Sequence, residues 1–197
     1  WRGPMVTSAL NQLMHQTKWG ELDYLIVDMP PGTGDIQLTL SQKVPVSGVV
    51  IVTTPQNIAT LDARKGLAMF RKVSIPVLGV VENMSGYRIR GKYAPNYTVS
   101  LIGPEGISID CISDDEGNWS TTLDIFKKGG GLSAAEELSV PYLGSLPFDP
   151  GIVRGGDDGV HRIIAEPEGE TAKAFDIIVD NITNSLNEGT TPSLRIT

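Results

Sequence analysis

The chain has 197 residues, a formal net charge of −7 and 40% hydrophobic residues, which is enough apolar material for the core of one domain. No apolar run reaches the roughly 18 residues of a membrane-spanning helix and no secretory signal opens the chain, so we expect a soluble, intracellular protein. The acidic balance argues against nucleic-acid binding, because such proteins contact phosphates through clustered lysine and arginine.

Short apolar runs alternate with stretches of helical periodicity along most of the chain. In chain order, the sequence predicts a helix at 5–17, strands at 25–27 and 48–54, a helix at 59–73, a strand at 77–81, a short helix at 133–138, a strand at 141–146 and a helix at 171–186. Runs that are apolar on both faces are typical of parallel strands covered by helices on each side. The pattern therefore predicts an α/β fold with a doubly wound, mainly parallel sheet.

The stretch from Tyr87 to about Leu123 breaks this alternation. It has no helical period, and its turn sequences surround β-prone runs at 99–102 and 107–112. We predict an inserted β-hairpin or small sheet there. Its basic beginning and acidic end suit a binding partner, and a solvated insertion without a partner is the alternative. Residues 187–197 are rich in Gly, Thr, Pro and Ser and predict a disordered tail.

Asp28 follows an apolar run and opens a loop rich in proline and glycine, Asp-Met-Pro-Pro-Gly-Thr-Gly-Asp. Open parallel sheets bind ligands at the carboxyl ends of their strands. A carboxylate there can hold a water molecule on Mg²⁺, and the Gly32 amide can approach a γ-phosphate and move when it is lost. The loop predicts a nucleoside triphosphate site, with Asp28 as a helix cap before an ordinary turn as the alternative.

Six blocks of sequence stand in a characteristic order. They are Trp1–Met5, Asp28–Asp35, Val52–Gln56, Gly79–Ser85, Gly129–Gly131 with Ala135–Leu138, and Leu143–Pro150. Together they resemble the Mrp/ApbC family of P-loop ATPases over nearly the whole chain except the 87–123 insertion. The resemblance implies a MinD-like ATPase that acts in iron–sulfur cluster assembly and carries clusters to apoproteins as a homodimer.

The resemblance also implies roles for single residues. Asp28 corresponds to the Walker B carboxylate, and Pro31 with Gly32 to the switch that senses the γ-phosphate. Asn83 matches the asparagine that recognises adenine, since its amide offers both a donor and an acceptor; a turn-forming residue after a strand is the alternative. The loop that closes over the base matches Pro147, Phe148 and Asp149.

The sequence lacks the Gly-rich loop ending in Lys-Ser/Thr that opens the domain in this family. Its only Gly-Lys pair, Gly91-Lys92, is followed by Tyr93. We therefore expect the chain to be the C-terminal part of a longer protein. Without that loop little remains to hold the α- and β-phosphates, so we expect this part alone to be inactive as an ATPase.

The sequence also departs from the family at the cluster site. A Cys-Pro-x-Cys motif normally follows the Glu-Asn-Met-Ser block, whereas this chain has Tyr87–Arg90 and then the insertion. Cys111 is the only cysteine, so two subunits supply two thiolates, half of what a four-cysteine cluster requires. Its neighbours Ile109 and Ile112 favour a packed strand residue, with iron–sulfur ligation as the alternative.

Two functions remain open at this stage. The first is an ATP- and Mg²⁺-binding protein of iron–sulfur cluster assembly or transfer, whose partners are iron–sulfur apoproteins or assembly factors. The second is a nucleotide-switched adaptor without a cluster that binds partners through residues 87–123. A MinD-like membrane ATPase is disfavoured because residues 186–197 contain only Arg195 as a cation. We expect neither a nucleic-acid nor a membrane partner, and a location in the cytoplasm, or in the mitochondrial or plastid matrix of a eukaryote.

Overall fold

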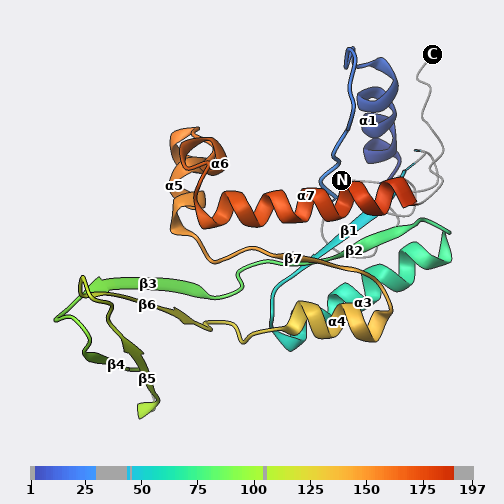
Figure 1. Cartoon of the computed structure of the whole chain (residues 1–197). Coiled ribbons are helices and arrows are strands. Elements are labelled where there is room, and N and C mark those ends of the chain that lie inside the picture. Colours follow the sequence, from blue (N-terminus) through green and yellow to red (C-terminus); the bar gives the residue numbers. More distant parts are fainter. Residues whose placement is uncertain (1–2, 30–43, 45, 104–105, 189–197) are drawn as a thin grey trace.

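The computed structural model describes residues 3–29, 44, 46–103 and 106–188 (Figure 1). Its elements are α1 (Gly3–Gln16), β1 (Val49–Thr53), α3 (Asn57–Lys72), β2 (Val77–Glu82), β3 (Tyr87–Lys92), β4 (Thr98–Ile102), β5 (Ser108–Ile112), β6 (Asn118–Leu123), α4 (Gly130–Leu138), β7 (Tyr142–Ser145), α5 (Pro150–Asp158), α6 (Arg162–Ala165) and α7 (Glu170–Glu188). None of the described helices is long and apolar enough to cross a membrane.

Three parallel strands form the central sheet, in the order β1-β2-β7. Helices α3 and α4 cover one face of this sheet and α7 covers the other, as Figure 1 shows. Each parallel connection passes through a helix, as the geometry of parallel pairing requires. The predicted doubly wound α/β fold is therefore confirmed, and the predicted strands near 48–54, 77–81 and 141–146 are those of the sheet.

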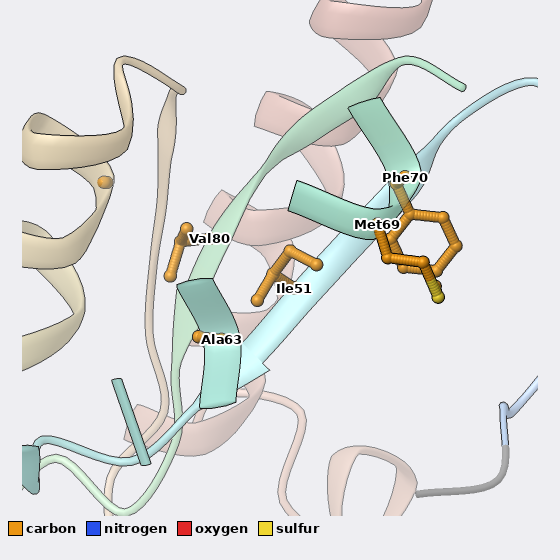
Figure 2. Close-up of a cluster of buried hydrophobic side chains, with 6 residues drawn as sticks. Ile51, Ala63, Met69, Phe70 and Val80 are labelled. Carbon is orange, nitrogen blue, oxygen red and sulfur yellow. The ribbon is translucent and has the colours of Figure 1, made fainter. Parts of the chain in front are cut away.

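The core has two layers, one on each face of β2. Figure 2 shows the layer beneath α3, which contains Ile51, Ala63, Met69, Phe70 and Val80. The layer beneath α7 contains Val81, Leu143, Leu146 and Ile178. Val80 and Val81 are consecutive in the strand and both buried, because successive side chains of a strand point to opposite faces. This is why the strand reads as a continuous apolar run in the sequence.

The prediction of a strand at 25–27 is wrong for the described structure. Residues 24–29 belong to no strand, and the side chain of Ile26 is 92% exposed. A strand is fixed by hydrogen bonds to a neighbouring strand. None of the described strands pairs with this segment. Apolar composition indicated a buried strand, but none of the strands that the structure describes lies beside this segment to bury it.

Residues 87–123 form an arm that projects from the α/β body (Figure 1). Near the body, β3 pairs antiparallel with β6, and at the tip β4 pairs antiparallel with β5. Ser113, which lies between β5 and β6, is buried. The Ser113 hydroxyl donates to the carbonyl of Ala94 at 2.6 Å and accepts from the Tyr97 N–H at 3.0 Å. The prediction that residues 87–123 are β-rich is confirmed.

The base of the arm is fixed to the C-terminal helix. Arg88 and Arg90, on β3, both form ion pairs with Glu170, the first residue of α7. The Tyr87 ring meets the Phe148 ring edge-on, with 5.9 Å between the centroids. The basic residues that the sequence offered for a partner are thus partly engaged within the chain.

Replacing Val80 by alanine tests the central position of β2. Val80 is fully buried, so Val80→Ala is expected to lower the free energy of unfolding by about 2 kcal/mol, through lost burial and a residual cavity. Val153→Ala makes the same change on α5 at a side chain that is 64% exposed, and it should leave stability within about 0.5 kcal/mol. Urea denaturation measures both; equal losses would contradict the described packing.

Candidate functional site

The loops that follow β1, β2 and β7 meet at one edge of the sheet, since parallel strands end on the same side. Backbone hydrogen bonds join them. The Asn83 N–H donates to the Thr53 carbonyl at 2.7 Å, and the Leu146 N–H donates to the Glu82 carbonyl at 2.8 Å. The Ser85 N–H in turn donates to the Leu146 carbonyl at 2.9 Å. This edge is the candidate site.

Asn83 stands directly after β2 and is half-buried. Its Oδ1 accepts the Met84 N–H at 2.9 Å, which closes a local turn, and Met84 has a positive φ of 58°. The Nδ2 amide of Asn83 has no hydrogen-bond partner among the residues that the structure describes. The side chain therefore forms a turn and still presents two free donors, so its two predicted roles are compatible.

The loop at 147–149 lies beside this turn. The Phe148 N–H donates to the Gly86 carbonyl at 2.9 Å. The Phe148 ring packs between Tyr87, at the base of the arm, and Phe126, at 5.9 and 6.4 Å between centroids. Pro147 is half-buried in the same loop. The structure thus brings together Asn83 and the three residues predicted to close over a base.

The Asp149 carboxylate joins three helices. Its Oδ1 accepts the Gly151 N–H at 2.7 Å and so caps α5, while its Oδ2 accepts from Arg162 Nε at 2.7 Å and from Thr171 Oγ1 at 2.6 Å. Burial works to raise the pKa of this carboxyl, but the hydrogen bonds from Thr171, Arg162 and the Gly151 N–H outweigh burial and lower it. The carboxylate therefore fixes the loop rather than pointing free toward a ligand.

Glu82 belongs to the site, and reasoning from the sequence missed it. Its carboxylate is 1% exposed and accepts from Ser85 Oγ at 2.6 Å and from the Gly131 N–H, at the start of α4, at 2.5 Å. A Cβ on Gly131 would lie 2.7 Å from the Glu82 Cβ, and one on Gly130 only 2.2 Å from the Pro55 carbonyl oxygen. The glycines thus let α4 begin against this edge. The signal in the sequence was a glutamate that ends an apolar run.

Of the predicted phosphate- and Mg²⁺-binding residues, Asp28, Pro31 and Gly32, the structure describes only Asp28. Asp28 is exposed and has no hydrogen-bond or ion-pair partner within the described part of the chain. Pro31 and Gly32 lie outside the described residues. The roles of these three residues stay predictions.

Cys111 lies on β5, far along the arm from this edge (Figure 1). Its side chain is partly exposed, and Sγ donates to the Val99 carbonyl at 3.6 Å. Within the described ranges, no group of three or more His, Cys, Asp or Glu side chains is arranged to hold a metal ion.

A family model described as ParA, NUBPL iron-transfer P-loop NTPase, matches residues 1–98 and 113–183. The chain belongs to this family. The stretch between the two matched parts, 99–112, contains most of the β4–β5 hairpin, so the tip of the arm lies outside the match.

Relatives of known name support the assignment to the NUBPL-type family. An iron–sulfur cluster carrier protein of a Synechocystis species is 44% identical over 187 residues, which are 95% of this chain and 46% of the relative. That of Pseudomonas fragi is 49% identical over 175 residues, 89% of this chain and 52% of the relative. That of Escherichia coli is 40% identical over 186 residues, which are 94% of this chain and 43% of the relative. The chain therefore spans about half the length of these relatives.

Solved structures agree on the fold. A nucleotide-binding protein of Archaeoglobus fulgidus, solved with ADP, is 26% identical with a TM-score of 0.57, over 80% of this chain and 54% of that one. MinD of Pyrococcus horikoshii, solved with Mg-ADP, is 16% identical with a TM-score of 0.58. The match covers 98% of this chain and 60% of the MinD chain. The MinD likeness concerns the fold alone. The predicted resemblance to MinD-like P-loop ATPases of the cluster-carrier family is confirmed.

The lowered pKa of Asp149 gives a test by pH. A carboxylate whose pKa is lowered by folding stabilises the protein above its unfolded pKa, and loses that contribution as the pH falls through the folded value. Asp149→Asn should therefore lower the free energy of unfolding by about 2 kcal/mol at pH 7, and this deficit should shrink below about pH 4. Urea denaturation at both pH values measures it.

Asp180→Asn is the control for that experiment, because Asp180 is exposed on α7. It should change neither the stability at pH 7 nor its acid dependence by more than about 0.5 kcal/mol. An Asp149→Asn deficit that stays constant with pH would contradict the proposed contribution of the charge.

Proposed function

We propose that this chain forms the base-binding part and the Mg²⁺-binding switch of an ATP-dependent protein that assembles or transfers iron–sulfur clusters. The observation that carries the proposal is the edge of the sheet where backbone hydrogen bonds of Ser85 and Gly86 join the turn of Asn83 to the loop of Leu146 and Phe148, while Asn83 Nδ2 has no partner among the described residues. Membership of an iron-transfer P-loop NTPase family supports the assignment of the nucleotide and the cargo.

Each residue has one task in this proposal. The Asn83 amide pairs with the edge of adenine, and the 147–149 loop covers the base. Asp28, whose carboxylate has no competing partner in the described structure, holds a water molecule of Mg²⁺. The Gly32 amide approaches the γ-phosphate and moves away when that phosphate is lost. Phosphoryl transfer depends on positioning and on neutralising charge. The loop from Asp28 to Asp35 moves when the γ-phosphate is lost, and this movement links hydrolysis to the release of a cluster or partner. We infer a homodimer and iron–sulfur apoproteins as recipients.

The cysteine content does not fit a cluster held by this chain alone. A four-cysteine cluster needs four thiolates, and two copies supply only Cys111 twice. A carrier therefore needs ligands from a further part of the protein or from a partner. The second candidate, a nucleotide-switched adaptor, is favoured by one observation: the tip of the arm, 99–112, lies outside the family match and carries the lone cysteine.

Substitution of Asp28 tests the ATPase. In the complete protein, Asp28→Ala should lower kcat for ATP hydrolysis by at least about 100-fold, because the carboxylate that orients the hydrated Mg²⁺ is lost. Asp23→Ala, an exposed aspartate five residues earlier, is the matched control and should hydrolyse ATP at the wild-type rate. Phosphate release measures the rate of both variants. An unaltered rate in Asp28→Ala would contradict the assignment of Asp28 as the carboxylate that orients the hydrated Mg²⁺.

Anaerobic reconstitution of the complete protein separates carrier from adaptor. A carrier should retain stoichiometric iron and sulfide after desalting, and Cys111→Ser should retain the same amount, because the ligands lie elsewhere. Iron and sulfide analysis with the visible absorption spectrum provides the measurement. Absence of bound iron and sulfide in both proteins would favour the adaptor. Loss only in Cys111→Ser would identify Cys111 as a ligand.

A further inference from the structure

Glu82 is a buried carboxylate that has no cationic partner among the described residues. It is 1% exposed, and no described lysine, arginine or histidine forms an ion pair with it. Burying a carboxylate is costly unless hydrogen bonds replace the lost water. Glu82 receives two such bonds, from the Ser85 hydroxyl at 2.6 Å and the Gly131 N–H at 2.5 Å. The positive end of the α4 dipole adds to their effect.

The two bonds hold the turn that carries Asn83. Glu82 precedes Asn83, and Ser85 follows it by two residues, so one side chain closes the turn from both ends. Within the turn, Met84 has φ of 58°, a conformation that residues with a side chain rarely adopt. Such a conformation persists only where its surroundings fix it. The carboxylate fixes it by joining the turn to the first residues of α4.

We propose that Glu82 is a positioning residue for base recognition: its carboxylate clamps the turn of residues 83–85 to the start of α4, and so sets the preference of the site for adenine over guanine. The inference rests on the proposed function. It assigns Glu82 no contact with the nucleotide, since its side chain is buried and both its oxygens are engaged. Its effect passes through the direction of the Asn83 amide.

The test compares Glu82→Ala with Glu82→Gln in the complete protein. Dissociation constants for non-hydrolysable ATP and GTP analogues are measured for each, together with the thermal midpoint. Glu82→Ala should reduce the ratio of ATP to GTP affinity by at least about fivefold, the scale of one lost hydrogen bond to the base. Glu82→Gln should restore the ratio to within about twofold, because its oxygen accepts from Gly131 and its amide donates to Ser85 Oγ.

Two further variants bracket the result. Asn83→Ala gives the ratio expected when the base-reading amide is absent, and Glu82→Ala should approach it. Glu137→Ala removes an exposed glutamate of α4 that pairs with Arg64, and it should leave the ratio unchanged. If Glu82→Ala does not fold, Ser85→Ala removes one of the two bonds, and a reduction of about twofold is then expected.

A purely structural Glu82 would lower the affinities for both analogues in parallel and leave their ratio unchanged in the folded Glu82→Ala or Ser85→Ala protein; that outcome overturns the inference. A wild-type protein that binds neither analogue overturns the proposed function as well. Wild-type preference for ATP together with an unaltered ratio in the variants overturns the role of Glu82 alone.

Discussion

Strand β2 pairs in parallel with β1 on one side and with β7 on the other, and both helical layers pack against it. Val80 faces α3 and α4, whereas Val81 faces α7, so two successive residues hold the two halves of the core. Because the three strands run the same way, their loops collect at one edge. The positions of Asn83 and the 147–149 loop follow from this pairing.

The elements with a strong period or a continuous apolar run were predictable. Strands β1, β2 and β7 and helices α1, α3 and α7 lie near their predicted places because their own residues specify them. Helix α5 was not predicted, since three of its nine residues are glycine, although Asp149 before Pro150 is a strong start signal. The strand at 25–27 failed for the opposite reason: its composition is right, but pairing depends on a neighbour that composition cannot supply.

The candidate site was predictable only in part. Asn83 and the 147–149 loop were found because their blocks resemble a family, and the structure places them side by side. Glu82 lies within one of those blocks, Gly79–Ser85, but the resemblance assigned it no role. Its importance depends on burial and on Gly131, which is 49 residues away in the chain, and no local pattern encodes such a contact. In the same way, Glu170 reads as an ordinary helix-start carboxylate until the ion pairs with Arg88 and Arg90 are seen.

The tip of the arm has a different kind of stability from the body. Along β4 and β5 the side chains alternate between exposed and half-buried, and none is fully buried. These strands are therefore held mainly by backbone hydrogen bonds and the polar contacts around Ser113. We therefore expect amide hydrogens there to exchange with solvent through local opening, and those of β2 only when the sheet itself opens. The tip of the arm, most of which lies outside the family match, is thus expected to open separately from the body.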